Sequence, residues 1–355
     1  MLAVSSPGTL ADALRSVPYL PTATLEEYAR RVRDQHPLLS DLLDYERPGT
    51  RAALATLAAT VTEFDTDETG RGDSYRSAQR DSGVRWTGAR QLLRLCLPDP
   101  LPHTASGGVV LDVLGGDGLL ARALDAHGGP ADPRPTLVTG DISGQMVDQA
   151  LAQGLPAVRQ AADFLFLRDA SVDAVLLAYG THHIARRDRP DAVREALRVT
   201  RPGGRVVLHD FDDASPMARF FTDVVHPHTA AGHDYPHFSR ESLHALFAAA
   251  GTAARVVDLY DPLVVHGATE DEARRGLCAY VGAMYGVADL FRREGPDASW
   301  ALLESVFDHS AYLATLPEPP DVPQAPVVHR TASGFAAELP RVAIVAVAEK
   351  AGPTA

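Results

Sequence analysis

The chain has little cysteine, a single lysine and no long apolar run. Cys96 and Cys278 are the only cysteines in 355 residues, which argues against a disulfide framework and is consistent with a reducing cytoplasm. No stretch approaches the roughly 18 to 20 uninterrupted apolar residues that a membrane helix needs. The first residues also lack the basic segment and apolar run of a secretion signal. We therefore expect a soluble cytoplasmic protein that does not contact a membrane.

Positive charge is also scarce, because the formal net charge is -13 and Lys350 is the only lysine. Arginine carries nearly all of the positive charge, a bias that suggests a GC-rich bacterial genome. Contacts to nucleic-acid phosphates need a basic surface, and the sequence has no dense Lys/Arg cluster with interleaved aromatic residues. These absences weigh against nucleic acid as a partner and favour a small-molecule substrate.

The chain divides into segments with different patterns. Much of residues 1–100 has apolar residues at three- and four-residue spacing, which predicts helices that serve as a lid or as the interface of a homodimer. Residues 101–266 alternate apolar runs with helical patterns. Residues 267–340 contain two long helical patterns and a proline-rich stretch, and residues 341–355 hold a final strand-like run and a tail. We interpret 267–340 as a helical cap inserted before the last strand.

The middle segment has the pattern of a sheet buried on both faces. Its apolar runs are VVLDVL (109–114), TLVTGDI (136–142), VDAVLLAYG (172–180), RVVLHDF (205–211) and ARVVDLY (254–260). Helical patterns lie between these runs. Continuous Val/Leu-rich runs that alternate with helices are typical of a parallel sheet with helices on both faces. The sequence therefore predicts a doubly wound α/β fold.

A glycine cluster follows the first apolar run, in VVLDVLGGDGLLARAL (109–124). Glycines between a strand and a helix let the backbone approach a ligand, and the helix start offers free N–H donors. Gly116, Gly118 and Ala121 satisfy the G-x-G-x-x-G/A spacing of a dinucleotide site. Asp112, however, would repel a pyrophosphate and attract a cation. S-adenosylmethionine is such a cation, because it carries an ammonium and a sulfonium group.

This run resembles motif I of the class I S-adenosylmethionine-dependent methyltransferases, and the resemblance continues in order over some 150 residues. LVTGDIS, QAADFLFL, VDAVLLAYGTHHI and REALRVTRPGGRVVLHDF are similar to the segments that follow motif I in that family. The resemblance implies a seven-strand, Rossmann-like core and S-adenosylmethionine as the cofactor, with S-adenosylhomocysteine as the product. It also implies the following cofactor-binding residues: Asp112, Gly115, Gly116, Gly118, Asp141, Ile142, Met146, Asp163, Phe164 and Tyr179.

Leu114 departs from the family pattern, which places a glycine two residues after the acidic position. Two alternatives to methyl transfer therefore remain open. The fold could bind S-adenosylmethionine and catalyse a cyclisation or rearrangement, or the chain could be an NAD(P)-dependent oxidoreductase, against which Asp112 argues. A structural alternative also exists for the carboxylates, since Asp112 could cap the glycine turn and Asp141 the next helix.

Eight histidines lie between residues 182 and 244. A neutral imidazole can take a proton from a nucleophile near pH 7, so His183 and His209 are the candidate catalytic residues, although packing is the simpler role for a histidine pair. A metal held by His209, Asp210 and a histidine of 226–233 has no recognisable spacing, so we predict none. The candidate substrate-binding residues are Tyr75, His182, His228, His233, Tyr280, Met284 and Tyr285.

These observations predict an S-adenosylmethionine-dependent methyltransferase that acts on oxygen, nitrogen or carbon of a small specialised metabolite, as in natural-product or antibiotic biosynthesis. Catalysis would depend mainly on alignment and on exclusion of water, because the sulfonium methyl is already a good electrophile. Ala-Tyr-Gly-Thr (178–181) stands where base- and amide-modifying relatives have an Asn/Asp-Pro-Pro-Tyr motif, which further favours a small acceptor.

Overall fold

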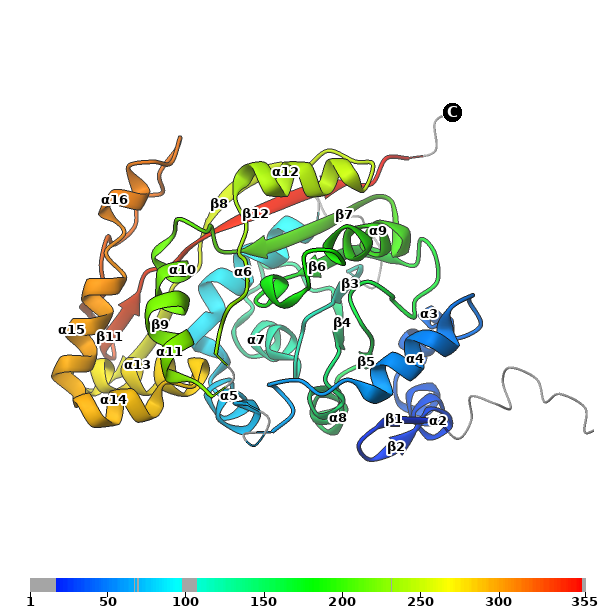
Figure 1. Cartoon of the computed structure of the whole chain (residues 1–355), viewed down its shortest axis with the longest axis horizontal. Helices are drawn as coiled ribbons and strands as arrows, with labels where there is room; N and C mark the ends of the chain where they lie inside the picture. Colours follow the sequence, from blue (N-terminus) through cyan, green and yellow to red (C-terminus); the bar gives the residue numbers. More distant parts are fainter. Residues whose placement is uncertain (1–16, 67, 69, 98–106, 231, 353–355) are drawn as a thin grey trace, which may run out of the picture.

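The computed structural model describes residues 17–66, 68, 70–97, 107–230 and 232–352. A seven-stranded sheet runs through the middle of the molecule, with strand order β5-β4-β3-β6-β7-β12-β8 (Figure 1). Its strands are β3 (Val109–Asp112), β4 (Thr136–Asp141), β5 (Ala157–Arg159), β6 (Val172–Leu177), β7 (Thr200–Asp210), β8 (Arg255–Tyr260) and β12 (Val342–Glu349).

The first five strands of the sheet are parallel, and β12 pairs antiparallel with both β7 and β8. The predicted doubly wound α/β fold is confirmed. The chain proceeds from β3 toward β5 on one side and from β6 toward β8 on the other. In such a sheet, a crevice opens at the carboxyl ends of the two strands where the order reverses. The fold therefore places a ligand site beside the ends of β3 and β6.

Alternate side chains of the strands enter two separate apolar cores. Val109 and Leu111 of β3 pack on one face of the sheet, and Val110 packs on the other. Side chains alternate because successive residues of a strand point to opposite faces. One face is covered by α8 (Gly144–Ala152), α9 (Arg189–Val199) and α12 (Arg240–Ala249), and the other by α6 (Trp86–Cys96) and α7 (Leu119–His127).

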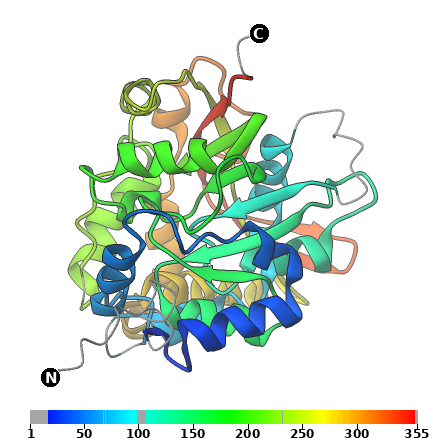
Figure 2. The ribbon, with the colours of Figure 1, turned by 90° about the vertical axis from the view of Figure 1, so that its right-hand side faces the viewer.

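The N-terminal segment covers the β5 edge of the sheet (Figures 1 and 2). It comprises β1 (Pro18–Leu20), β2 (Ala23–Thr24), α2 (Leu25–Gln35), α3 (Pro37–Leu42) and α4 (Thr50–Ala59). Helix α2 begins at a capping box in which Thr24 and Glu27 each accept the other's backbone N–H. The hydroxyl of Tyr28 donates to the carbonyl of Ala157 in β5 over 2.8 Å, which attaches this segment to the sheet.

Residues 60–85 connect the N-terminal segment to α6. They contain α5 (Gly72–Ala78) and a 3-10 turn, η1 (Ser82–Arg85). Helix α5 has seven residues, about two turns. Helix α5 contacts α13 (Glu270–Tyr285) of the later insertion, so elements that are about two hundred residues apart in the sequence meet near the carboxyl ends of the strands.

The segment between β8 and β12 is more than a helical cap. It contains α13, α14 (Ala288–Glu294), α15 (Pro296–Val306), α16 (Ser310–Leu313) and a second sheet of order β10-β11-β9. The strands of that sheet are β9 (Leu263–Gly267), β10 (Val327–Thr331) and β11 (Gly334–Leu339), all antiparallel. Each has only five or six residues and β9 pairs across about 70 residues of chain, so no local period distinguishes them from the loops around them.

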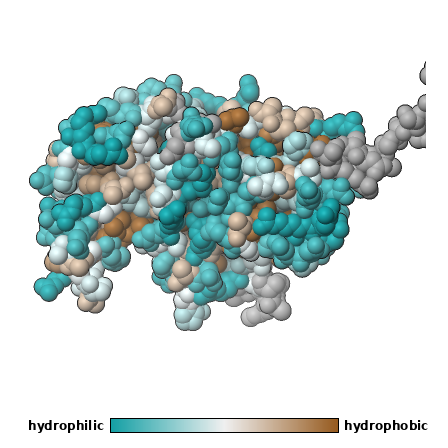
Figure 3. All heavy atoms as spheres, turned by 90° about the horizontal axis from the view of Figure 1, so that it is seen from below, coloured by the Kyte–Doolittle hydropathy of each residue, from teal (hydrophilic) through white to brown (hydrophobic). Residues whose placement is uncertain are grey.

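Short helical pieces follow β7, namely α10 (Pro216–Phe220), a π-helical turn η3 (Phe221–Val225) and α11 (His226–His228). Within the described ranges, no helix is both long and apolar enough to cross a membrane. The face seen from below in Figure 3 is largely hydrophilic, with apolar atoms in small separate areas. Leu38 and Val61 are large apolar side chains that lie exposed.

Candidate active site

Four loops meet at the carboxyl ends of the central strands. They follow β3 (113–118), β4 (142–143), β6 (178–183) and β7 (211–215), and they lie around the point where the strand order reverses. The third loop contains a 3-10 helical turn, η2 (Thr181–His183). Ligands of open α/β sheets bind in this crevice, so the structure brings the sequence-predicted motifs to one rim.

Two carboxylates, one buried and one half-buried, lie side by side at the ends of β3 and β4. Asp112 is 3% exposed, and burial, followed by the nearby charge of Asp141, raises its pKa to about 8. Burial also raises the pKa of Asp141 to about 6, although that carboxylate accepts the N–H groups of Ser143 (2.8 Å) and Gly116 (2.9 Å). A bound cation would relieve both penalties, because an opposite charge favours the ionised form.

The glycine turn after Asp112 leaves room for a ligand. Gly116 has φ +59°, in the left-handed region that favours glycine, and a side chain added there would meet no atom within 4 Å. By contrast, a Cβ on Gly115 would come within 2.8 Å of the Asp112 carboxylate. The N–H of Gly115 donates to the carbonyl of Gly140, which fixes the turn against β4.

Leu114, the residue that departs from the family pattern, is half-buried and packs against the apolar cluster that contains Leu111 and Val113. Its side chain therefore contributes to the core at the strand end. Gly118, with φ +88°, caps the N-terminus of α7.

The remaining candidate cofactor residues lie at different places along the rim. Met146 is buried at the start of α8, where its N–H donates to the Ser143 hydroxyl, and Ile142 is half-buried beside it. Asp163 is exposed, whereas Phe164 is half-buried, with the guanidinium of Arg47 4.1 Å from its ring centre. The N-terminal segment thus covers the Phe164 end of the rim.

Tyr179 lines a cavity between the sheet and the cap. Its φ of +61° is unusual for a non-glycine residue and costs on the order of 1–3 kcal/mol, a strain that proteins commonly keep at functional sites. Its hydroxyl donates to Asp261 over 3.2 Å, and its ring packs 4.7 Å from that of His209.

Residues 63–66 pass over the rim next to the carboxylates. The hydroxyl of Ser143 donates to Asp65 over 2.6 Å, and the Asp65 charge is one of the factors that raise the pKa of Asp141. The neighbouring Phe64 packs against Tyr75 and His183, with ring centres 5.1 and 5.4 Å away. One short segment therefore touches both the carboxylate site and the histidines.

The cavity that Tyr179 lines is enclosed by the sheet, the N-terminal connection and the cap. It has a volume of about 30 Å³. That is room for one or two water molecules, so a larger acceptor would need the covering segments to move. Its lining residues are Phe64, Arg71, Tyr75, Arg85, Tyr179, Gly180, His182, His183, His209, Asp210, Phe211, Phe221, Met284 and Tyr285.

Two of the buried arginines around this cavity have a carboxylate partner. Arg71 pairs with Glu63 over 2.9 Å, and Arg341 pairs with Asp261 over 2.7 Å. Arg85 is 4% exposed and has no carboxylate partner among the described residues. Its guanidinium lies 4.4 Å from the ring centre of Tyr179. Arg85 is therefore the cation around this cavity whose charge is available to a ligand.

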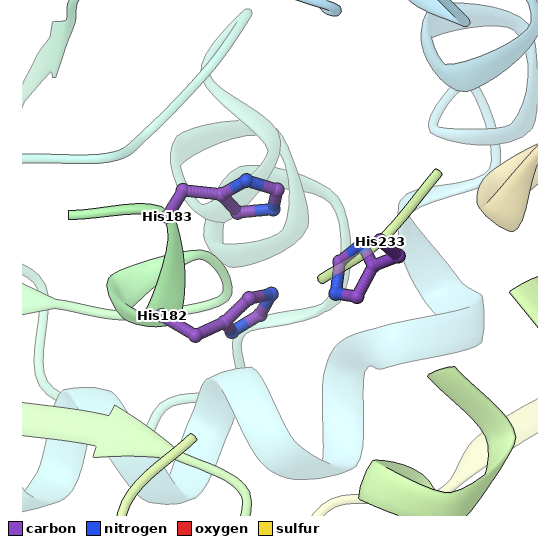
Figure 4. A group of neighbouring side chains, drawn as sticks. All are labelled: His182, His183 and His233. Carbon is purple, nitrogen blue, oxygen red and sulfur yellow. The ribbon is translucent and has the colours of Figure 1, made fainter. Parts of the chain in front are cut away.

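Histidines gather on the opposite side of the cavity. His182 and His183 of η2 lie with His233, which comes from the loop after α11, and one nitrogen of each is within 4.8 Å of the others (Figure 4). Burial lowers the pKa of all three imidazoles, so they are neutral at pH 7. The sequence placed each of them at the site but gave no sign that they converge.

The other catalytic and substrate candidates lie at varied distances from this centre. His209 is fully buried, with Nε2 3.6 Å from Asp261. Met284 and Tyr285 of α13 line the cavity, as does Tyr75 of α5, and Tyr280 is buried near Arg85. His228 is exposed on α11 and is not among the lining residues.

Sequence reasoning missed four charged residues of this site, namely Glu63, Arg71, Arg85 and Asp261. None belongs to a motif, and their partners lie 8 to 213 positions away along the chain. Only the position of Arg85, directly before a helix in GVRWTG, could have suggested a residue held at a helix start.

Comparison with known proteins identifies the middle of the chain. Residues 111–208 match the methyltransferase domain family. Over 119 residues the chain is 32% identical to the ubiquinone/menaquinone biosynthesis C-methyltransferase UbiE of Pseudomonas fluorescens, covering 31% of this chain and 44% of that protein. The corresponding enzyme of Pseudomonas paraeruginosa is 31% identical over 123 residues, covering 32% of this chain and 46% of that protein. The match thus spans less than half the length of these curated relatives.

Solved structures with a similar arrangement include the YcgJ protein of Bacillus subtilis and a phosphoethanolamine N-methyltransferase of Haemonchus contortus. The first has a TM-score of 0.45 and 17% identity, and covers 75% of this chain and 98% of its own. The second has a TM-score of 0.48 and 14% identity, and covers 83% of this chain and 61% of its own.

The strand order, the motif positions and the family match define the class of this protein. It contains a class I S-adenosylmethionine-dependent methyltransferase domain, as the sequence predicted. S-adenosylmethionine is the cofactor of this class.

Proposed function

We propose that this chain transfers the methyl group of S-adenosylmethionine to an oxygen, nitrogen or carbon atom of a small organic acceptor, a specialised metabolite. The observation that carries the proposal is the pair of carboxylates, buried Asp112 and half-buried Asp141, beside the open backbone of Gly116. A cationic ligand with hydroxyl groups matches that combination, whereas the pyrophosphate of a nicotinamide dinucleotide would meet two carboxylates.

The residues present fit the cofactor. Asp112 would attract its cationic end, Asp141 would accept its ribose hydroxyls, and Gly116 would let it approach the backbone. Ile142, Met146, Asp163 and Phe164 would flank the adenine. When bound, the cofactor supplies an electrophilic methyl group. The protein aligns the acceptor with it and excludes water, which is where most of the rate enhancement would arise.

The acceptor would lie in the cavity between Tyr75, Tyr179, Met284 and Tyr285. His183 lines that cavity and is the candidate base, since burial and the neighbouring His182 hold its pKa well below the usual value and leave the imidazole unprotonated. His209 is fully buried beside Asp261, and we propose that it orients Tyr179 and the loop after β6.

The first test is calorimetric titration of the cofactor-free protein with S-adenosylmethionine and S-adenosylhomocysteine, repeated on Asp141→Ala. We expect micromolar binding that the substitution weakens tenfold or more, or about 1.4 kcal/mol. Asp125→Ala is the matched control, because Asp125 is exposed on α7, and it should bind like the wild type.

Absence of binding to either ligand would overturn the proposal. Binding of S-adenosylmethionine, with acceptor consumed but no S-adenosylhomocysteine formed, would instead favour the non-methylating cyclisation or rearrangement that Leu114 suggests.

We further propose that the acceptor carries an anionic group that pairs with Arg85. A buried guanidinium without a carboxylate partner lowers the stability of the ligand-free fold. Arg85→Met should therefore raise the free energy of unfolding by about 1 kcal/mol, as substitutions that relieve functional strain often do. The same variant should lose binding of benzoate, a simple aromatic carboxylate, measured by calorimetry in the presence of S-adenosylhomocysteine. A loss of stability with unchanged benzoate binding would show that Arg85 is structural.

A further inference from the structure

Three imidazoles from two distant parts of the chain surround a common space in Figure 4. His182 and His183 are adjacent in η2, and His233 comes from the loop between α11 and α12. The ring centre of His233 lies 5.1 Å from that of His182 and 5.3 Å from that of His183. The ring centres of His182 and His183 are 4.5 Å apart. One ring nitrogen from each histidine lies within 4.8 Å of the other two. The three rings therefore offer three nitrogen ligands to a single point.

Two of the three histidines have ring nitrogens without a hydrogen-bond partner among the described residues. His182 and His233 are 5% and 4% exposed. Within the part of the chain that the structure describes, Nε2 of His182 and both ring nitrogens of His233 make no hydrogen bond. Buried polar atoms are nearly always satisfied in native proteins, and an exception calls for an explanation such as an ion. A cation bound at this point would satisfy these atoms.

The surroundings hold His182 in the orientation that a metal ligand needs. Nδ1 of His182 lies 3.0 Å from both carboxylate oxygens of Asp210, so Nδ1 carries the proton and Nε2 presents its lone pair. Metal-binding histidines are commonly oriented by a carboxylate in this way. His237 also lies beside Asp210, with Nδ1 3.4 Å from one carboxylate oxygen.

His233 is also fixed in place. Its ring stacks on Phe221 at 4.0 Å with an angle of 15° between the planes, and its backbone N–H donates to Nδ1 of His226 over 2.9 Å. His183 packs against Phe64 and Tyr235. These contacts limit the entropy that the side chains would lose on binding an ion.

The charge around the three histidines allows a divalent cation. Two arginines lie close to the histidines. Arg71 is paired with Glu63 over 2.9 Å, and Arg189 donates to the carbonyl of His182 over 3.1 Å. The second oxygen of Glu63 lies 3.4 Å from Nδ1 of His183 and has no hydrogen bond among the described residues. Together with Asp210, the site has two carboxylates against two arginines, so a cation bound there would not meet a net positive charge.

We propose that His182, His183 and His233 bind one divalent transition-metal ion, with Asp210 as the positioning residue for His182. Zinc fits best, because three histidines and one open position form a common zinc site. Zinc–nitrogen bonds of 2.0–2.1 Å place tetrahedral ligands about 3.3 Å apart, which small ring rotations would achieve from the present arrangement. His182 and His183 line the cavity, so the open position would face the acceptor and take one of its oxygen atoms.

The proposal departs from the prediction from sequence, which expected no metal, and with metal bound His183 is a ligand and not the proton acceptor. It does not depend on methyl transfer, since metal binding can be measured without either ligand of that reaction. The full chain is stripped with a chelator, dialysed and titrated with Co²⁺ and with Zn²⁺. Bound metal is measured by mass spectrometry, and the Co²⁺ complex by its visible absorption. We expect one ion per chain and the absorption of a tetrahedral nitrogen site.

Two ligand variants and one control complete the test. His233→Ala should weaken metal binding at least a hundredfold, and Asp210→Asn should weaken it ten- to a hundredfold. His244→Ala is the control, because His244 is exposed on α12, and it should bind like the wild type. Should His233→Ala not fold, His183→Asn serves instead, since the His183 side chain is 19% exposed. Circular dichroism verifies the fold of each.

Substoichiometric metal in the wild type, or equal affinity in the wild type and both ligand variants, would overturn the proposal. S-adenosylhomocysteine affinity is measured on the same metal-free preparations. Loss of the expected metal binding with S-adenosylhomocysteine binding retained would overturn the metal site but not the proposed function. Metal binding without S-adenosylhomocysteine binding would overturn the proposed function but not the metal site.

Discussion

Replacing Arg341 by methionine is expected to lower the free energy of unfolding by about 3–5 kcal/mol, the range typical of breaking a buried ion pair. Arg341 and Asp261 are both 0% exposed, and Nη2 donates to the carboxylate over 2.7 Å. Arg341 also donates to the Asp261 carbonyl (2.8 Å) and to the Tyr285 hydroxyl (3.0 Å). Methionine fills similar volume but leaves the Asp261 carboxylate buried without its counter-charge.

Urea denaturation followed by circular dichroism measures this loss. The double variant Asp261→Asn/Arg341→Met removes both charges and should recover a large part of it, because the cost of a buried pair arises mainly when one partner is left alone. Arg85→Met provides the comparison, because Arg85 has no carboxylate partner among the described residues and its replacement leaves no buried carboxylate unpaired. A loss below about 1 kcal/mol for Arg341→Met would contradict the expectation.

Helix α6 packs closely against this ion pair at a glycine. A Cβ on Gly88 of α6 would come to 1.8 Å from Oδ1 of Asp261, so only glycine allows α6 to approach the ion pair. The pair in turn holds β12 to the start of the cap, because Asp261 follows β8 and Arg341 precedes β12. The sequence does not predict this pair, because its members lie 80 residues apart and belong to no local pattern.

The parts of the fold that could be predicted are those that depend on short-range patterns. The apolar runs that end at Asp112 and Asp141 predicted strands β3 and β4. The glycines between strand and helix predicted the turn. Both features follow from short-range requirements, namely a strand buried on both faces and a turn that needs glycine. Tyr179 is a predicted cofactor residue, and the structure adds contacts with Asp261 and Arg85 that no sequence pattern indicates.

The histidine site could be predicted only in part. His182 and His183 were recognisable as a pair after a strand, and their position at the rim followed from the fold. His233 lies 50 positions later in a loop, and its approach depends on the Phe221 ring on which it stacks. Spacing in sequence carries no information about such a contact, because the loop could close in many ways.

Cofactor affinity is expected to rise steeply with pH. Burial raises the pKa of Asp112 to about 8 and that of Asp141 to about 6. A cationic ligand favours the ionised forms, so binding must release the protons that the free protein holds on these groups. Between pH 6 and pH 8 about one proton is released, by Asp112, and the dissociation constant of S-adenosylmethionine should fall on the order of 10- to 100-fold.

Calorimetry at pH 7 in two buffers of different ionisation enthalpy counts that proton directly. Asp112→Asn should bind more weakly, release no proton at pH 7 and show a flatter pH profile, and Asp125→Ala should behave like the wild type. The same profile in the wild type and in Asp112→Asn would mean that Asp112 does not meet the cation.

The same shift makes a prediction for the protein without its cofactor. The pKa of Asp112 is higher in the folded chain than the value of about 3.9 in an unfolded chain, so its contribution to stability is fully present below pH 4. That contribution is lost as the pH rises through about 8. S-adenosylmethionine should therefore raise the midpoint of thermal unfolding more at pH 8 than at pH 6. Asp112→Asn should remove that difference, because an amide has no proton to lose.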